Sequence, residues 1–460
     1  MEKDRRAGIN RREFIGAAVA GAGVAAAVAT TGRERPASRR PNLLFILADD
    51  LGWGDLSCYG RPDYQTPNLD QLARQGVRFT QAYSASPVCT PTRCAFITGR
   101  YPARTPVGLE EPLAWKKQLE AQKRDVGLPP EHPTVASLLT SAGYETALVG
   151  KWHLGYLPKY SPTKSGFAEF FGIMSGGADY FTHRDANNEN DLFEMEVPVE
   201  RVGYITDLLT ERAIAFISRR HERPFYLSLH YTAPHWPWEG PNDERASRPA
   251  RLGYAGMTAG GSLEIYAAMM KSLDEGIGKV LKALGAAGRE RDTIVIFTSD
   301  NGGERFSYNW PFAGQKFELL EGGIRVPALV RWPGTIPANR MTDQVAVTMD
   351  WTATILAAAG ATAAPAHPLD GENLLPLLKG ERAPFERTLF WRYKQQAAVR
   401  KGKWKYYRAD EKNERLFDLS ADAREQSDFK TSHAPVLDEL RGDYQKWEAQ
   451  VLKQPVARTT

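Results

Sequence analysis

Short apolar runs of strand length alternate with longer amphipathic stretches along most of this 460-residue chain. Uncharged, mostly apolar runs predict strands at 43–47, 146–149, 225–229, 293–297 and 326–330. The stretches between them predict helices over 66–75, 134–142, 204–220 and 262–285. Strands that are apolar along their whole length are typical of parallel strands buried on both faces by helices. The sequence therefore predicts an α/β fold with a large, mainly parallel mixed sheet flanked by helices.

A different pattern begins at about residue 386. Short runs separated by polar turns predict strands at 388–393, 397–400, 404–408 and 415–419, followed by a helix over 434–453. This pattern indicates a small C-terminal antiparallel sheet with one helix. A chain of this length usually divides into more than one domain. We predict a leader and linker over 1–36, a catalytic domain over 37–385 and a small α+β subdomain over 386–460.

The first residues resemble an export signal. Arg11 and Arg12 precede an uncharged Ala/Gly/Val run over 16–29, which is shorter and less apolar than the roughly 20 residues of a spanning helix. Paired arginines before such a run resemble a twin-arginine signal, and Ala29 or Ala37 would mark the cleavage site. The alternative is a disordered tail with chance arginines. We expect a periplasmic or secreted protein, carried by the twin-arginine translocase and without a stable membrane anchor.

Charge and cysteine content exclude two other classes. The formal net charge is +4, of which residues 1–36 carry +3, so the remainder has no basic excess for nucleic acid. Only Cys58, Cys89 and Cys94 occur, too few for a disulfide framework. A Cys58–Cys94 bridge and two unpaired buried thiols are both compatible with the sequence, and we favour the thiols.

Polar residues come after four of the predicted strands, at the point where each strand ends. They are Asp49 and Asp50, Lys151 and His153, His230 and His235, and Asp300 and Asn301. In open parallel sheets the ligand site lies beyond the carboxyl ends of the strands. We therefore expect one composite site at this edge of the sheet.

The acidic members of this set predict a metal site. Asp49, Asp50, Asp300 and Asn301 would bring three carboxylates and an amide together, and a hard divalent cation would relieve their repulsion. An all-oxygen ligand set favours Ca²⁺, with Mg²⁺ or Mn²⁺ as alternatives. The competing interpretation is that the acids only cap turns.

The cationic members predict an anion pocket. Residues that could hold an anionic group and move protons are Arg93, Lys151, His153, His235 and Lys316. Taken singly, each is more often a surface or core residue. His230 is interpreted as a strand-end residue and is left out of the site.

These residues lie in motifs that resemble those of the type I sulfatases, a family with the alkaline phosphatase-like fold. The central match is Cys89-Thr90-Pro91-Thr92-Arg93, in which Thr92 replaces a serine that is commoner in the family. Further matches in the family's order are Gly52-Trp53-Gly54-Asp55, Thr66-Pro67-Asn68-Leu69-Asp70, Ile97-Thr98-Gly99-Arg100, Gly150-Lys151-Trp152-His153-Leu154-Gly155, Ser299-Asp300-Asn301-Gly302 and Glu321-Gly322-Gly323. The resemblance spans roughly residues 41–420, and the combination is much more specific than any one motif.

The resemblance implies that a separate formylglycine-generating or sulfatase-maturating enzyme oxidises Cys89 to formylglycine. The hydrated aldehyde carries two hydroxyls on one carbon, of which one attacks sulfur and the other then expels sulfate. The implied substrate is a sulfate monoester of a carbohydrate or an aryl alcohol, either a sulfated small molecule or a glycan, and inorganic sulfate is released.

Roles for the other residues are also carried over from the resemblance. The implied metal ligands are Asp49, Asp50, Asp300, Asn301 and the modified Cys89. Arg93 and Lys151 would steady the hydrate, and His153 would take up the proton when sulfate is expelled. Lys151, His235 and Lys316 would bind the sulfate group, with His235 and Lys316 assisting the leaving alcohol.

Other functions remain compatible with these residues. A phosphonate monoester or phosphodiester hydrolase of the same superfamily could use the same pocket. A two-zinc phosphatase is disfavoured because the predicted metal ligands include no histidine. A non-catalytic glycan-binding protein is the alternative from another class, with Trp152, Trp236 and Trp238 stacking on sugars. Residues 107–131 and 176–200 are predicted loops or short helices that rim the pocket.

Overall fold

The structure is a computed structural model that describes residues 40–109, 111, 125–247 and 252–452. The predicted leader over 1–36 and part of the predicted rim segment 107–131 lie outside these residues. Within the described residues, no helix is both long enough and apolar enough to cross a membrane.

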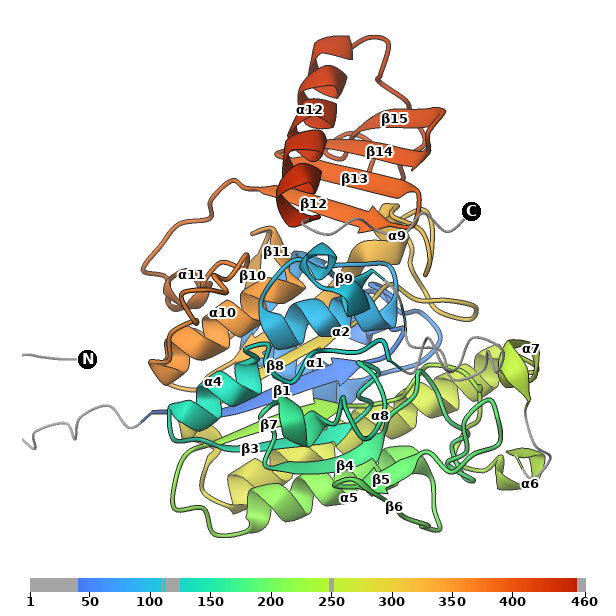
Figure 1. The fold of residues 1–460 in the computed structure, drawn as a ribbon, viewed down its shortest axis with the longest axis vertical. Coiled ribbons are helices and arrows are strands. Elements are labelled where there is room, and N and C mark those ends of the chain that lie inside the picture. Colours follow the sequence, from blue (N-terminus) through green and yellow to red (C-terminus); the bar gives the residue numbers. More distant parts are fainter. Residues whose placement is uncertain (1–39, 110, 112–124, 248–251, 453–460) are drawn as a thin grey trace, which may run out of the picture. The chain divides into compact units, whose positions relative to one another are not determined.

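A mixed sheet of eleven strands forms the centre of the fold (Figure 1). The order is β10-β2-β9-β8-β1-β7-β3-β4-β5-β6, with β11 paired to β2. The bounds are β1 (Asn42–Ala48), β2 (Val77–Tyr83), β3 (Glu145–Gly150), β4 (Glu169–Ile173), β5 (Leu192–Glu194), β6 (Val197–Pro198), β7 (Phe225–His230), β8 (Thr293–Ser299), β9 (Arg325–Arg331), β10 (Arg340–Thr342) and β11 (Ala346–Val347).

Most of this sheet is parallel, as predicted. The central strands β8, β1, β7, β3 and β4 all run in the same direction, whereas β9 is antiparallel to both β8 and β2. The edge strands β5 and β6 are also antiparallel. Leu47 at the end of β1 pairs with Thr298 of β8 and with His230 of β7, and His230 also pairs with Gly150 of β3. The carboxyl ends of four consecutive strands are therefore in register.

Helices cover both faces of the sheet because alternate strand residues point to opposite sides. Leu44 and Ile46 belong to the core shared with α1 (Pro67–Arg74), α5 (Ile205–Ser218) and α8 (Leu263–Ala286). Phe45 belongs to the opposite core, with α2 (Cys89–Thr98), α4 (Val135–Ser141) and α10 (Thr348–Ala359), and its ring stacks on Phe96 at 3.7 Å between centroids. The remaining helices of this region are α6 (Glu244–Ser247), α7 (Gly253–Met257), α9 (Glu321–Ile324) and α11 (Leu375–Lys379), with 3-10 turns at Ser57–Tyr59, Pro102–Arg104, Pro106–Gly108, Pro162–Ser165 and Glu290–Asp292.

The C-terminal region forms a separate four-stranded antiparallel sheet, as predicted (Figure 1). Its strands are adjacent in sequence order: β12 (Thr388–Tyr393), β13 (Gln396–Lys401), β14 (Trp404–Asp410) and β15 (Asn413–Asp418). Helix α12 (Ala434–Val451) buries Leu440 and Tyr444 in a core shared with these strands.

Several local predictions require correction. The segment 176–200, predicted as loops or short helices, contains the hairpin of β5 and β6, whose strand β5 pairs with β4. Helix α1, predicted over 66–75, begins at Pro67, and the Thr66 side chain before it bonds with Ser57 and Asp70 and does not cap the helix. All three cysteines are free, although Cys58 is only partly buried.

Candidate active site

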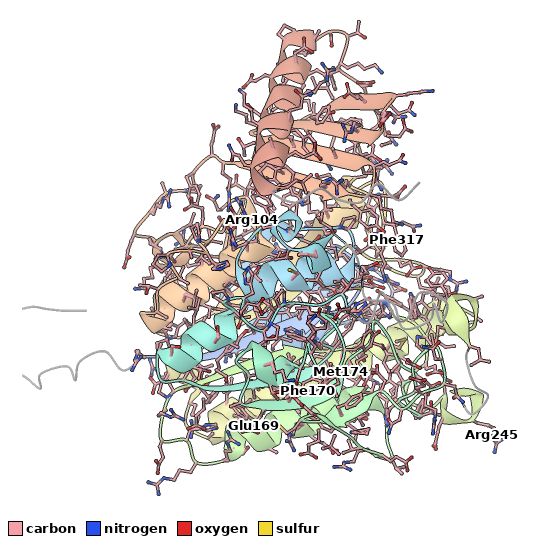
Figure 2. All side chains as sticks on the ribbon, in the orientation of Figure 1. Arg104, Glu169, Phe170, Met174, Arg245 and Phe317 are labelled. Carbon is pink, nitrogen blue, oxygen red and sulfur yellow. The ribbon has the colours of Figure 1, made fainter. Side chains whose placement is uncertain are left out.

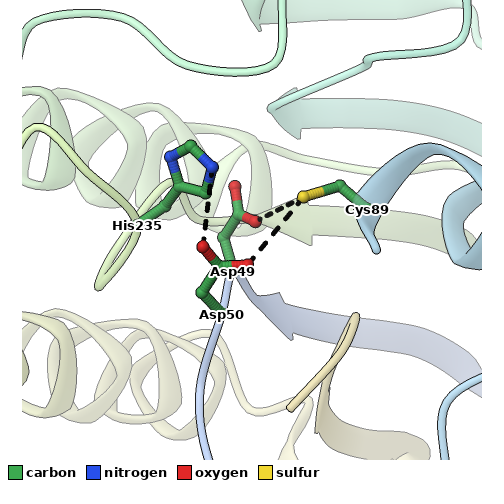
Figure 3. Close-up of side chains that lie close together, drawn as sticks. All are labelled: Asp49, Asp50, Cys89 and His235. Atoms are coloured by element: carbon green, nitrogen blue, oxygen red, sulfur yellow. Dashed lines mark hydrogen bonds and ion pairs between the residues drawn. The ribbon is translucent and has the colours of Figure 1, made fainter. Parts of the chain in front are cut away.

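The strand-end residues meet at one edge of the sheet because β8, β1, β7 and β3 are consecutive neighbours. Asp49 and Asp50 come directly after β1, Lys151 after β3, and Asp300 after β8. Cys89 comes from a different element, the first turn of α2, and joins them from beside the sheet (Figure 3). The structure thus brings together residues separated by up to about 250 positions in the chain.

Cys89 is buried against the two acids that follow β1 (Figure 3). Its Sγ lies 3.3 Å from Asp49 Oδ1 and 3.9 Å from Asp50 Oδ1. Thr90 Oγ1 donates to the His153 carbonyl at 2.9 Å, which fixes the start of α2 beside the loop after β3. Burial and the nearby Asp49 raise the pKa of the Cys89 thiol well above its ordinary value, so the unmodified thiol is a poor nucleophile.

A buried ion-pair network surrounds Asp49 and Asp300. Arg93 donates from Nε and Nη2 to Asp300 Oδ2 at 3.0 and 2.8 Å, and from Nη1 to the Lys151 carbonyl at 3.0 Å. Lys151 Nζ lies 2.6 Å from Asp49 Oδ2. All four side chains are fully buried, so their charges interact with little screening by water.

The pKa values of the two acids respond differently to this network. Burial and the like charge of Asp300 raise the pKa of Asp49 to about 7, against the opposing effect of Lys151. Burial also acts to raise the pKa of Asp300, but Arg93 and Lys151 lower it below its ordinary value. A further positive charge in the site would therefore stabilise the ionised form of Asp49 more than that of Asp300.

Asp50 is held by a second set of contacts. Lys316 Nζ lies 2.6 Å from Asp50 Oδ2, and Asn301 Nδ2 donates to Asp50 Oδ1 at 2.7 Å. His235 Nε2 lies 3.6 Å from the same carboxylate (Figure 3). Lys316 also faces Glu304 Oε2 at 3.8 Å. A second ammonium is therefore anchored in the site, at Asp50.

Two histidines border this cluster. His235 Nδ1 lies 2.6 Å from the Trp236 carbonyl, which leaves Nε2 facing Asp50. Burial and the charges of Lys316 and Lys151 lower the pKa of His235 well below its ordinary value, so its imidazole is neutral near pH 7. The backbone at Gly176 and Gly177 approaches the rings of His153 and His235 so closely that a Cβ would lie 2.7 and 3.0 Å from them.

The chemistry of these donors fits a hard divalent cation. Donor atoms of Asp49, Asp50, Cys89 and His235 all lie within 4.8 Å of one another. Among the described residues, the buried Oδ1 of Asn301 has no hydrogen-bond partner, which is the state expected of an amide oxygen that ligates a cation. The predicted ligand Asp300 accepts from Arg93 and from the Asp50 backbone beside these donors, and His235 joins the group as a further candidate.

Sequence reasoning missed two residues of the site. His230 Nδ1 lies 3.4 Å from Arg93 Nη1 and 3.1 Å from the Lys151 carbonyl, and burial lowers its pKa to about 3, so it is a neutral neighbour of the network. Its strand-end position was the available signal. Glu304 lies three residues after Asn301 and faces Lys316, but a single acid in a polar loop gave no signal.

Comparisons with known proteins bear on this arrangement. The sequence model of the family described as "Sulfatase" matches residues 41–361, and that described as "N-sulphoglucosamine sulphohydrolase, C-terminal" matches residues 311–450. Human N-acetylgalactosamine-6-sulfatase is 36% identical over 375 residues, covering 77% of this chain and 69% of the relative. Human arylsulfatase A is 35% identical over 409 residues, covering 80% and 75%.

Solved structures show the same fold. The structure of Ps i-CgsB in complex with k-i-k-neocarrahexaose superposes with a TM-score of 0.79 at 31% identity, covering 89% of this chain and 93% of that chain. The structure of BT4656 in complex with D-glucosamine-2-N,6-O-disulfate has a TM-score of 0.70 at 21% identity, covering 92% and 100%.

Proposed function

From the premise that this chain belongs to the sulfatase family, whose members hydrolyse sulfate esters, we propose that it cleaves sulfated carbohydrates through a formylglycine made from Cys89 and a divalent metal. The observation that carries the proposal is the position of Cys89. Its Sγ lies at the carboxylates of Asp49 and Asp50, each of which is paired with a buried lysine.

The formylglycine and the metal ion would each supply one kind of chemistry. Hydrated formylglycine at position 89 supplies two hydroxyls on one carbon, one for attack on sulfur and one for expulsion of sulfate. A divalent cation held by Asp49, Asp50, Asp300, Asn301 and the modified residue 89 would supply positive charge that favours the deprotonated hydroxyl and the sulfate oxygens. The proposed ion is Ca²⁺, with Mg²⁺ and Mn²⁺ as the alternatives.

The side chains of the chain itself bind and orient the sulfate group. Lys151 presents its ammonium at Asp49 and Lys316 at Asp50, and Arg93 fixes Lys151 through its carbonyl. His235 offers Nε2 beside Lys316; because Nδ1 donates to the Trp236 carbonyl, the neutral ring presents a lone pair there, and His235 is proposed to assist the leaving alcohol after it takes up a proton. His153, at the end of the same segment as Lys151, is proposed to take up the proton when sulfate leaves.

The preference for carbohydrate over aryl esters draws on the similar proteins. One solved structure with 31% identity contains a neocarrahexaose, and the relatives include N-acetylgalactosamine-6-sulfatases. The conversion of Cys89 would require a formylglycine-generating or sulfatase-maturating enzyme as a partner.

Sulfate release from defined sulfated sugars tests the proposal. The protein is matured with its modifying enzyme, residue 89 is checked by mass spectrometry, and rates are compared on a sulfated sugar, an aryl sulfate and an aryl phosphonate. We expect turnover of the sulfated sugar, loss of most activity in excess chelator, and recovery with Ca²⁺. Faster turnover of the phosphonate would assign the phosphorus alternative, and full activity in chelator would contradict the metal site.

We also propose that residues 1–36 direct export through the twin-arginine translocase to the periplasm or the medium. The paired Arg11 and Arg12 before the uncharged run support this. Replacing both arginines by lysine should leave the protein in the cytoplasm, as fractionation and immunoblotting would show. Unchanged export of that variant would rule out a twin-arginine signal.

A further inference from the structure

Phe317 combines two properties that are unfavourable for a large apolar residue. Its backbone has a φ of 76°, in the left-handed region that bulky side chains rarely adopt. Its side chain also remains 36% exposed, so burial does not compensate for the strain. Strained residues of this kind occur mainly at functional sites, where the surrounding structure holds them in place.

Three segments hold the backbone of Phe317 beside the active site. The Phe317 amide donates to the Pro87 carbonyl at 3.0 Å, two residues before Cys89. The Lys316 amide donates to the Gly303 carbonyl at 3.1 Å, two residues after Asn301. Gln396, in the C-terminal sheet, donates from Nε2 to the Phe317 carbonyl at 2.7 Å. The backbone that carries the ring is therefore held close to Cys89 and to the proposed metal ligands.

The ring also lies next to the proposed sulfate-binding ammonium. Lys316 Nζ lies 5.4 Å from the centroid of the Phe317 ring and 5.7 Å from that of Trp236. Lys316 itself is only 4% exposed, whereas the Phe317 ring reaches solvent. Figure 2 labels Phe317 near the C-terminal sheet, consistent with its bond to Gln396. A sulfate group bound at Lys316 would thus have an exposed aromatic ring beside it.

We propose that Phe317 is a stacking platform for the alcohol part of the sulfate ester, and that this alcohol is a ring with a flat apolar face. A sugar and an aryl group share this chemistry, and both pack favourably on an aromatic face. This proposal rests on the proposed function, because it takes Lys316 as a sulfate ligand. It assigns Phe317 a role in recognising the leaving group.

The test measures binding separately from turnover. Cys89→Ala protein, which cannot form formylglycine, is titrated with a sulfated monosaccharide, an aryl sulfate and an acyclic alkyl sulfate. The same titrations are repeated with Phe317→Asn added. Asparagine tolerates the left-handed backbone, so the variant removes the ring and keeps the chain conformation. We expect Kd to rise about tenfold for the ring ligands and to change less than about twofold for the alkyl sulfate.

Met195 offers a matched control. It has a φ of 56° and a side chain that is 37% exposed, but it lies in the turn between β5 and β6 and bonds to Phe170. Figure 2 labels Phe170 and Phe317 in different parts of the view. Met195→Asn should leave every Kd unchanged, and Phe317→Trp should restore binding of the ring ligands.

Each outcome bears on one proposal. Equal Kd values with and without the Phe317 ring, or equal losses for ring and alkyl sulfates, would overturn the platform. A larger loss for the sugar than for the aryl sulfate would assign the platform to sugars, and the reverse would assign it to aryl groups. Tight binding without turnover in the matured wild-type protein would contradict the proposed chemistry while leaving the platform intact.

Discussion

Asp50 shows how many requirements a single residue meets in this site. It adopts a left-handed backbone with a φ of 61°, its amide donates to Asp300, and its carboxylate contacts Lys316 and Asn301. A left-handed conformation costs roughly 1–2 kcal/mol for most residues but less for Asp and Asn. The turn lets Asp49 and Asp50 present both carboxylates toward Cys89, which an extended strand would send to opposite faces.

At this scale we predict that Cys89→Ala reduces sulfate ester turnover to background while the protein stays folded. The substitution removes the precursor of the nucleophile but only one small buried atom, at a cost of about 1 kcal/mol. Cys94→Ala is the matched control, since Cys94 is buried in the same helix and its Sγ lies 3.1 Å from Thr105 Oγ1. Turnover and circular dichroism of both variants check this. Activity in Cys89→Ala, or its loss in Cys94→Ala, would contradict the assignment.

Asp191 provides a prediction about pH. Burial raises its pKa from 3.8 to about 7, although its two oxygens accept from the amides of Met174 and Ser175. Because the folded state holds the proton more tightly than the unfolded chain, the stabilisation is complete below pH 3.8 and is lost as pH rises through about 7. Between about pH 5 and pH 8 the loss amounts to roughly 3 kcal/mol.

Asp191→Asn should therefore reduce the difference in the free energy of unfolding between about pH 5 and pH 8 by roughly that amount. Urea unfolding at both pH values measures it. The control is Asp292→Asn, which changes an exposed acid and should keep the wild-type difference. A pH dependence that Asp191→Asn leaves unaltered would show that Asp191 is ionised throughout.

At the scale of elements, the strand ends position the site because the backbone there is closely packed. Gly150, the last residue of β3, has a φ of 118°, and a Cβ on it would lie 1.8 Å from the His230 carbonyl of β7. Lys151 comes directly after it and reaches Asp49 from this position. The approach of β3 to β7 therefore determines where the Lys151 ammonium lies.

We predict that Gly150→Ala destabilises the fold by roughly 3 kcal/mol or more and lowers turnover, because the Cβ forces the strands apart and displaces Lys151. Gly60→Ala is the control for the strained backbone alone. Gly60 has a φ of 107° but no atom within 4 Å of its Cβ position, so the cost should be only about 1 kcal/mol. Denaturant unfolding compares the two. Equal losses would show that the contact with His230 is unimportant.

At the scale of the whole molecule, buried charges join the C-terminal sheet to the main sheet. Lys405 of β14 is fully buried and pairs with Glu321 at 2.9 Å and Glu425 at 2.7 Å. Glu321 also accepts from Tyr83 of β2 at 2.6 Å. Burial opposes ionisation of Glu321, but Lys405 and Arg325 lower its pKa to about 2. The helix that begins at Glu321 packs against Gly302, the residue after Asn301. The ion-pair network therefore helps to hold the backbone next to Asn301 in place.

Removing the shared cation tests this support. Lys405→Met should lower the free energy of unfolding by about 3–5 kcal/mol, because it removes the ion-pair partner of the buried Glu425 and leaves Glu321 paired with Arg325. Adding Glu425→Gln should recover part of that loss, since one of the two charges is then removed. Chemical denaturation measures the free energies of unfolding. Turnover at a temperature where both variants are folded shows whether the active site around Asn301 is disturbed. A stable single variant would mean that the ion pairs contribute little.

Local sequence patterns were enough to predict the buried strands, the polar residues at their ends and the C-terminal sheet with its helix. These features are local, because an uncharged apolar run must be buried on both faces and the residues after a strand must lie at the edge of the sheet. Cys89 was likewise found in a recognisable motif. Its place at the start of a helix was not predicted, because the burial of residues 89–98 on all sides hides any helical period.

Which segments become neighbours, in contrast, is determined only by the tertiary structure. The order β8-β1-β7-β3 puts Asp300 next to Asp49 and both next to Lys151, although neither the order nor the antiparallel direction of β9 can be read from local pattern. The contacts of Phe317 with Pro87 and Gln396 depend on a loop meeting two distant segments. Strand order and loop contacts are set by long-range packing, in which residues with no local signal, such as Glu304, gain a partner only when the chain is folded.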